Sequence, residues 1–259
     1  MDLLTLALLF GGVLAGAISA VAGGASFLTF PLLLATGMSP MAANITNWVA
    51  LSPGNFVALL AYRSELRQLH LAQSDTGPSL RAQMIVSGLG GLTGAGLLLA
   101  TPELRFEQAV PWLMLLATLI FALGDWTRRR LLASGESLRQ PRRPVLLFCL
   151  YLLMIYGGYF GSGLGIMLLA MLTVLGETSI HRANAHKNLL IAVLSVGVLG
   201  FYFSSEQMQW RYGLPLFIGG LLGGYLGVRL SRHVPDRFIR GAVLAWAAVL
   251  TAYMFWKYG

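Results

Sequence analysis

Two segments carry asparagines and other hydrogen-bonding residues inside otherwise apolar sequence. Positions 44, 47, 51 and 55 share one helical face, as do positions 184, 187, 191 and 195. Amide and hydroxyl groups spaced in this way can replace the water around an oxyanion, and an ammonium group can balance its charge. Alternatively, the asparagines only join neighbouring helices. The candidate residues of the two segments are Asn44, Thr46, Asn47, Asn55, Asn184, His186, Lys187 and Asn188.

Two glycine-rich turns precede these polar segments. They are Ala22-Gly23-Gly24-Ala25-Ser26 and Gly161-Ser162-Gly163-Leu164-Gly165. A helix broken at such a turn presents free N–H groups and the positive end of its dipole, and both suit an anion. The glycines can also serve only to let helices pack closely. The candidate residues of the turns are Gly23, Gly24, Ser26, Ser162 and Gly163.

Lys187 and His186 are ionisable residues within an apolar stretch, which makes them functional candidates because a buried charge is costly. Two interpretations of Lys187 stay open. It can contact an anion, or it can anchor the chain at the lipid headgroups, since it lies about one turn from the end of its segment. His186 can titrate near neutral pH and couple proton movement; the alternative is a hydrogen-bonded structural histidine.

The composition is that of a membrane protein, with 56% hydrophobic and 11% charged residues. A soluble domain carries roughly a quarter charged residues. Long uncharged runs rich in Leu, Ala and Gly indicate a helical bundle that crosses the bilayer several times. Met1–Ala22 lacks a basic start, so we expect a retained membrane segment and not a signal peptide. Cys149 is the only cysteine, which excludes intramolecular disulfides and cysteine metal clusters.

The basic residues indicate the orientation of the chain. Most of the 18 Lys and Arg residues fall in or beside the loops 63–81, 128–143 and 229–240, which we therefore expect on the cytoplasmic side. The net charge of +8 is then a topology signal, and a nucleic-acid partner is not expected. For parity, the stretch 145–175 must leave the cytoplasm and return to it. Its second arm has about ten residues, too few for a full crossing, so we expect a half-helix.

The sequence also repeats internally. A shift of 139 residues places Gly24 on Gly163, and a shift of 140 places Asn44 on Asn184, as in transporters built from duplicated halves. We expect an all-α polytopic membrane protein with two inverted repeats, each a broken, re-entrant helical hairpin followed by three transmembrane helices. The expected organisation is a first repeat over 1–127 (hairpin 3–37, helices 41–62, 80–100 and 108–126), a basic cytoplasmic linker over 128–143, and a second repeat over 144–259 (hairpin 145–176, helices 183–203, 213–231 and 238–257).

The run from Gly16 to Pro31 with its Gly-Gly turn, followed by Gly37-x-Ser39-Pro40-x-x-Ala43-Asn44-x-Thr46, resembles the sulfite exporter TauE/SafE family of membrane permeases. Residues 157–188 resemble that family's second half, and the resemblance spans nearly the whole chain. It implies transport of sulfite, sulfonates or related small organic anions. The first turn has fewer glycines than is usual in the family, and the second copy carries His186-Lys187. These departures leave the substrate open.

We therefore expect a secondary transporter or facilitator of small anions in the inner membrane, with the substrate near the midplane between the two hairpins. Both termini are expected outside, and the lipid bilayer and the anion are the expected partners. No cofactor and no metal are expected, and a homodimer is compatible with the small residues on many helix faces. Two alternatives remain: an intramembrane enzyme that uses Ser162, for which His186 would be the base, and a non-transporting assembly or scaffold protein.

Overall fold

The computed structural model describes residues 2–21, 23–71, 77–134, 142–174, 177, 179–230 and 236–258. Within them the chain forms helices and no strands, which confirms the expected all-helical class. Ala22, Gly176 and residues 135–141 and 231–235 of the expected cytoplasmic loops lie outside the described residues. The helices are α1 (Leu3–Val21), α2 (Ser26–Leu34), α3 (Pro40–Ala61), α4 (Arg63–Leu71), α5 (Leu80–Ala100), α6 (Glu103–Ser134), α7 (Arg143–Tyr159), α8 (Leu164–Val174), α9 (Ile180–Tyr202), α10 (Trp210–Leu230) and α11 (Asp236–Tyr258).

Three of the long helices begin at a serine cap. The side chains of Ser39, Ser79 and Ser179 accept hydrogen bonds from the backbone N–H three residues later, at the starts of α3, α5 and α9. Such a cap satisfies one of the N–H groups that the first turn of a helix leaves without a partner. Pro40 then occupies the first position of α3, where its missing N–H costs nothing.

Glycine turns separate helix α1 from α2 and helix α7 from α8. Gly23 and Gly24 have φ angles of +77° and +82°, and Gly161 and Gly163 have +77° and +79°. Side-chain-bearing residues rarely adopt this left-handed region, so glycine is the residue that these turns require. The arms that follow are short, nine residues in α2 and eleven in α8, in agreement with the half-helix expected for the second hairpin.

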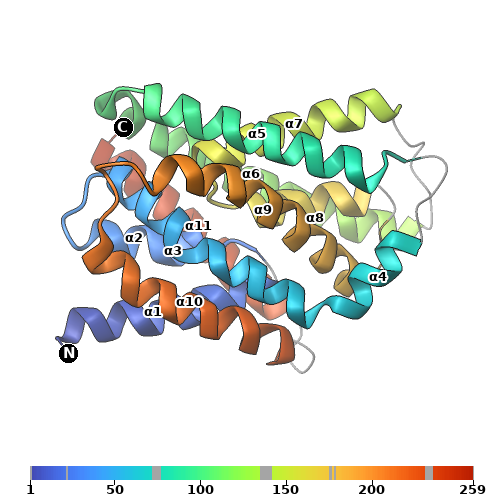
Figure 1. The fold of residues 1–259 in the computed structure, drawn as a ribbon, viewed down its shortest axis with the longest axis horizontal. Coiled ribbons are helices and arrows are strands. Elements are labelled where there is room, and N and C mark those ends of the chain that lie inside the picture. The colour runs from blue at the N-terminus through green and yellow to red at the C-terminus, as the bar shows by residue number, and fades with distance from the viewer. Residues whose placement is uncertain are drawn as a thin grey trace.

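The helices are arranged in paired sets (Figure 1). α1 lies beside α10, and α5 lies beside α7, while α3 and α9 pack between these two pairs and against each other. α6 and α11 pack together and contact the short arms α8 and α2. Backbones approach closely in the outer pairs: a Cβ built on Gly16 would lie 2.4 Å from the carbonyl oxygen of Gly220. Small residues allow this close packing in membrane helices.

Several helix bounds differ from the sequence-based expectation. The segment 63–81 was expected as a loop but contains α4, whose Leu66 and Leu69 pack on a small cluster around Tyr62 and Ala185. The helix expected over 108–126 runs from Glu103 to Ser134, because helix-favouring Arg and Leu residues extend it past its apolar part into the expected linker. The apolar run therefore predicts which part of the helix lies in lipid, but it does not predict where the helix begins and ends.

Three described helices are long and apolar enough to span a membrane by length and composition: α1 (Leu3–Ala20), α5 and α9. The sequence predicts more membrane-spanning helices than these three. α3 shows one reason for the difference, because it has 22 residues but Asn44, Asn47 and Asn55 lower its hydropathy. Both chain termini lie at one end of the bundle, and α4 lies at the opposite end (Figure 1).

Candidate functional site

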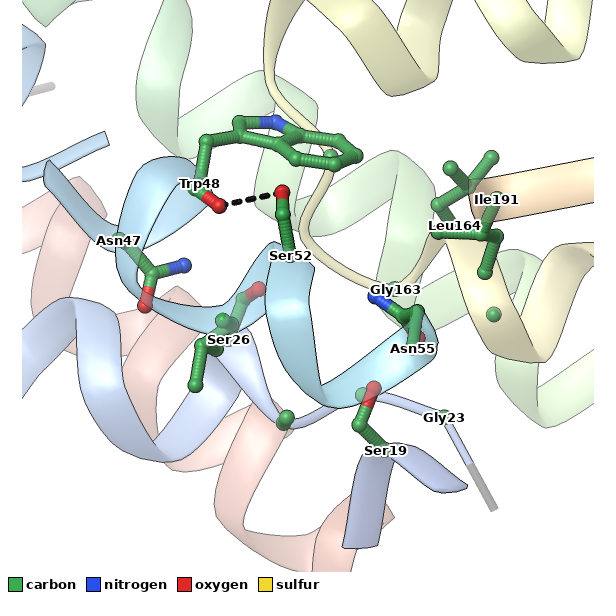
Figure 2. A pocket seen from close by; sticks show the side chains of 15 residues that line it. Ser19, Gly23, Ser26, Asn47, Trp48, Ser52, Asn55, Gly163, Leu164 and Ile191 are labelled. Carbon is green, nitrogen blue, oxygen red and sulfur yellow. Dashed lines mark hydrogen bonds between the residues drawn. The ribbon is translucent and has the colours of Figure 1, made fainter. Parts of the chain in front are cut away.

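A pocket lies where the two glycine turns meet, and its empty volume, including the open mouth, is about 450 Å³. Both turns and the middle of α3 form its walls (Figure 2). A Cβ built on Gly23 would lie 2.7 Å from the carbonyl carbon of Gly165, which shows how tightly the turns approach. The lining residues are Ser19, Gly23, Gly24, Ala25, Ser26, Asn47, Trp48, Leu51, Ser52, Asn55, Gly161, Gly163, Leu164, Gly165 and Ile191.

Six of the thirteen candidate residues line this pocket, and five of the six come from the first half of the chain. The six are Gly23, Gly24, Ser26, Asn47, Asn55 and Gly163. The other seven lie outside the lining; they are Asn44, Thr46, Ser162, Asn184, His186, Lys187 and Asn188. The structure thus brings together the two turns and the stripe on α3, whereas the corresponding stripe on α9 contributes only Ile191.

Asn47 and Asn55 give the pocket its amide groups. Both are buried, with 3% and 6% of their surfaces exposed. The Oδ1 of Asn47 accepts a hydrogen bond from the hydroxyl of Thr29, and its Nδ2 is turned toward the pocket (Figure 2). Asn55 makes no hydrogen bond to the described part of the chain, and its Oδ1 is buried without a partner. An amide donates only through its Nδ2, so the Nδ2 groups of Asn47 and Asn55 are the atoms that could serve an anionic ligand.

Trp48 is a lining residue that the sequence analysis missed. Its indole packs on the second turn, since a Cβ on Gly161 would lie 2.3 Å from Nε1. The Nε1 has no hydrogen-bond partner among the described residues. Ser52, which was not among the candidate site residues, donates its hydroxyl to the carbonyl of Trp48 at 2.6 Å. The available signal was spacing, because residues 44, 48, 52 and 55 also follow one helical face.

The short helices α2 and α8 both begin at the pocket. Ser26 and Leu164, their first residues, are in its lining. The N–H groups of Phe27 and Leu28 in α2 and of Leu164 and Ile166 in α8 donate to carbonyl groups of the turns. These helix starts therefore act on the pocket mainly through the positive ends of their dipoles. Two such ends that converge on one cavity favour negative charge there.

Lys187 lies outside the pocket lining and is held at the end of α1. It is completely buried, and its ammonium group donates to the carbonyl oxygen of Ser19 at 2.7 Å, in the last turn of α1. It is therefore not a headgroup anchor, and it does not line the pocket. It does lie directly behind the pocket wall, because a Cβ on Gly165 would be 3.5 Å from its Cδ.

Other candidates hold helices together. The amide of Asn188 donates to the carbonyl of Ala20 at 3.2 Å, and that of Asn44 donates to the carbonyl of Tyr159 at 3.1 Å. The hydroxyl of Thr46 accepts from the backbone N–H of Gln209 at 3.1 Å. These contacts match the interpretation that polar residues of the stripes join neighbouring helices. Some residues of the stripes thus line the pocket, and others form hydrogen bonds between helices.

Ser162, Asn184 and His186 contain buried polar atoms without partners in the described part of the chain: Oγ, Oδ1 and Nε2, respectively. The hydroxyl of Ser162 makes no hydrogen bond to His186, so the described structure contains no pair of the kind that the alternative of a serine enzyme requires. The backbone carbonyl of Ser162 instead accepts from the hydroxyl of Tyr156 at 2.7 Å, which helps to hold the second turn.

The fold and the pocket describe a helical membrane protein with an internal polar site between two broken helices. Residues 8–254 match the sulfite exporter TauE/SafE family, and the chain belongs to this family of membrane transporters. The resemblance found in the sequence is thereby confirmed.

Relatives extend over nearly the full chain. The probable membrane transporter protein YfcA of Escherichia coli (strain K12) is 30% identical over 253 residues, which cover 96% of this chain and 88% of that protein. A probable membrane transporter protein of Haemophilus influenzae is 30% identical over 259 residues, 98% of this chain and 96% of its own. No solved structure matches the chain. The family and these names agree with the expectation of a transporter and not an enzyme.

Proposed function

We propose that the protein is a secondary transporter or facilitator of small anions, such as sulfite, sulfonates or related organic anions, and that it binds them in the pocket between the two turns. One observation carries this proposal: two positive helix ends converge on a single cavity whose wall also holds the amides of Asn47 and Asn55 and the unpaired indole N–H of Trp48. An oxyanion that leaves water needs donors in place of its hydration shell, and hydrogen bonds to charged groups are the stronger kind.

The charges around the pocket also support an anion. Its lining contains no Asp or Glu residue. The ammonium group of Lys187 is bound to Ser19, which is itself a lining residue. At low dielectric a positive charge behind the wall acts on an anion in the cavity without touching it. The proposed contacts are the side chains of Ser26, Asn47 and Asn55, beside the positive dipole ends of α2 and α8.

The proposal includes two inverted repeats. The shift of 140 residues relates Tyr62 to Tyr202, and both hydroxyls donate to the last turn of a first hairpin arm, to Ala20 in α1 and to Gly158 in α7. The same relation matches α1 with α7, α3 with α9, and α5 with α10. The packed pair α1–α10 then corresponds to α7–α5, and the pair α3–α10 corresponds to α9–α5. Rocking of one repeat against the other would expose the pocket to each side in turn.

We place the protein in the inner membrane, with the central linker in the cytoplasm and both termini outside. The termini share one end of the bundle, as an even number of membrane passes requires (Figure 1). Large apolar side chains face outward along the helices, among them Leu3, Trp112, Phe148 and Trp256, each more than half exposed. Such a surface fits lipid as its surroundings.

Sulfite and sulfonate flux into proteoliposomes tests the proposal. Wild-type protein is expected to carry these anions, and the Asn47→Ala, Asn55→Ala double variant is expected to lose most of the flux. Asn184→Ala is the matched control, because it removes a buried amide that lies outside the pocket. Equal flux through the wild type and the double variant would exclude this site, and no flux through the wild type would exclude these substrates.

A further inference from the structure

The end of α1 concentrates negative partial charge inside the protein. The helix breaks before Gly23, whose N–H donates to the carbonyl of Ile18 at 3.0 Å, while the carbonyls of Ser19 and Ala20 receive no backbone N–H from the described residues. Their dipoles add to a partial negative charge at this end. Ala20 is buried, with 1% of its surface exposed, so little water is available to compensate that charge.

Three side chains meet these carbonyl groups. The ammonium group of Lys187 donates to Ser19, while the amide of Asn188 and the hydroxyl of Tyr62 donate to Ala20 at 3.2 and 3.4 Å. The Oδ1 of Asn188 is fully buried and has no partner in the described chain. Lys187 thus brings a positive charge into a cluster of oxygen atoms at a helix end.

The end of α7, the other broken helix, is satisfied differently. Tyr202 donates to the carbonyl of Gly158, and Asn44 donates to that of Tyr159. Both of these donors are neutral. The residue that the 140-residue shift relates to Lys187 is Asn47, which bonds to Thr29 and faces the pocket. Of these two helix ends, the one at α1 is therefore the one that receives a cationic side chain in the described contacts.

Carbonyl oxygens at the C-terminal ends of broken helices are the groups that hold coupling cations in many secondary transporters. We propose that Lys187 takes the place of such a cation: its ammonium group is a monovalent cation tethered to α9 and seated on the end of α1. This inference rests on the proposed anion transport, and it adds that the transport needs no free sodium ion.

The position of the charge gives it a role in binding. Ser19, which holds the ammonium group, and Gly165, which lies against the Lys187 side chain, both line the anion pocket. A bound anion therefore has a fixed countercharge on the far side of one wall. A sodium ion would need to bind and leave in every cycle, whereas Lys187 stays with α9 throughout.

Flux of sulfite, supplied with sodium, potassium or choline as the only cation, tests the inference on the full chain in proteoliposomes. Wild-type flux is expected to be equal in the three salts. Lys187→Ala is expected to lose about tenfold or more in choline, since it removes a hydrogen bond with a charged partner. Added sodium, lithium or methylammonium should restore much of this loss, because the vacated space retains the carbonyl oxygen of Ser19, next in the chain to that of Ala20.

Two controls separate charge from structure. Lys187→Arg keeps the charge and should stay independent of the salt. Asn188→Ala removes a neutral donor from the same helix end and should lower flux equally in all three salts. Two results would overturn the inference that Lys187 replaces a coupling cation. One is a Lys187→Ala flux in choline equal to that of the wild type, and the other is a loss of flux that no added cation restores.

The wild type alone gives a second measurement in case Lys187→Ala does not fold. Titration of purified wild-type protein with sulfite should give the same Kd with or without 100-fold excess sodium over sulfite. A Kd that falls about tenfold with sodium would overturn the inference while leaving anion transport intact. If neither flux nor binding of sulfite or a sulfonate is found in any salt, the proposed function fails first, which is a distinguishable result.

Discussion

The two glycine turns have similar backbones but different surroundings. Gly23 and Gly161 share a φ of +77°, and each turn is followed by a short helix that begins at the pocket. The polar helix of the first half, α3, places Asn47 and Asn55 in the pocket wall. That of the second half, α9, instead bonds to the end of α1 through Lys187 and Asn188.

This difference indicates how the two proposed repeats divide their tasks. Both turns break a helix with left-handed glycines, which are adjacent in the first turn (Gly23 and Gly24) and separated by Ser162 in the second (Gly161 and Gly163). Side chains on the following helices differ, since one set can hold the broken helix while the other remains available to a ligand. The proposed repeats therefore predict unequal effects when corresponding regions are changed.

The largest effect is expected at a turn. Gly161→Ala forces a side-chain-bearing residue to a φ of +77° and drives its Cβ into the indole of Trp48. Strain of this kind costs about 1–3 kcal/mol before the clash is added, so we expect a large fall in Tm and loss of flux.

Gly96→Ala in α5 is the control, because a Cβ there would meet no atom within 4 Å. Gly23→Ala should match Gly161→Ala, since it has the same φ and a Cβ contact of 2.7 Å with backbone. Thermal unfolding in detergent compares the three. Full stability of either turn variant would contradict the strained geometry of the turns.

The next effect separates a pocket asparagine from an asparagine that binds a helix end. Asn55→Ala should weaken sulfite binding by about 1.5–3 kcal/mol, the range for a hydrogen bond to a charged group. Its Tm should change little, because Asn55 makes no hydrogen bond to the described protein. Asn188→Ala should do the reverse, lowering the Tm through its lost bond to Ala20 while Kd stays nearly constant. Calorimetry measures the sulfite Kd of both variants, and thermal unfolding measures their Tm. Equal changes of Kd and Tm in the two variants would contradict the different roles of Asn55 and Asn188.

Much of the fold could be predicted from the sequence, since the signals are local. The turns at Gly23-Gly24 and Gly161–Gly165 follow from glycines that interrupt apolar runs, and the short second arms follow from length. α4 was missed because Leu66 and Leu69 are apolar residues within a charged segment, and the cluster that they cover is assembled from α1, α3 and α9. A helix stabilised by distant residues leaves a weak local pattern.

The site was predicted in part for a related reason. Spacing shows which residues share a helical face, but the rotation of the packed helix decides what that face meets. Asn47 and Asn55 face the pocket, whereas Lys187 at the corresponding place faces the end of α1. Trp48 was missed because an aromatic residue in an apolar helix resembles an ordinary core residue until the second turn is placed beside it.

A smaller effect is expected at the tyrosines that bind the two broken helices. Tyr202→Phe removes the hydroxyl bond to Gly158 and should lower the free energy of unfolding by about 1 kcal/mol. Tyr62→Phe should cost less, since its bond to Ala20 is longer, at 3.4 Å, and Asn188 also donates to that carbonyl. Unfolding of both variants in detergent provides the comparison. A larger loss for Tyr62→Phe would contradict this ranking.

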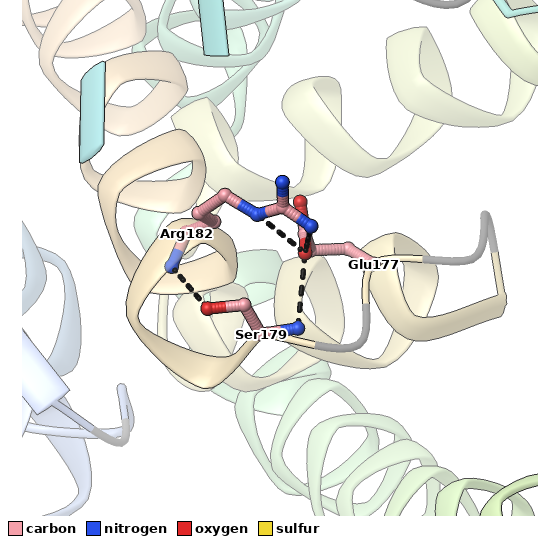
Figure 3. A network of polar contacts seen from close by, with 3 residues as sticks. All are labelled: Glu177, Ser179 and Arg182. Atoms are coloured by element: carbon pink, nitrogen blue, oxygen red, sulfur yellow. Dashed lines mark hydrogen bonds and ion pairs between the residues drawn. The ribbon is translucent and has the colours of Figure 1, made fainter. Parts of the chain in front are cut away.

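The smallest effect is expected where α9 begins, at a contact that the described start of α3 lacks. The Oε1 of Glu177 accepts from the backbone N–H of Ser179 and from the guanidinium of Arg182, and Ser179 caps the helix (Figure 3). α3 has the corresponding cap, Ser39, but Ala42 stands where Arg182 does. The Arg182 side chain is 35% exposed, so this ion pair should contribute at most about 1 kcal/mol.

Glu177→Gln should therefore lower stability by about 0.5 kcal/mol, and 1 M salt should reduce the difference from wild type because exposed charges are screened. Ser39→Ala and Ser179→Ala remove the caps themselves and should each cost about 1 kcal/mol, which makes the two halves equal in this respect. Thermal unfolding at low and high salt measures all three variants. A loss at Glu177 that exceeds the loss of either cap and persists in salt would mean that the carboxylate holds α9 more strongly than its exposed partner allows.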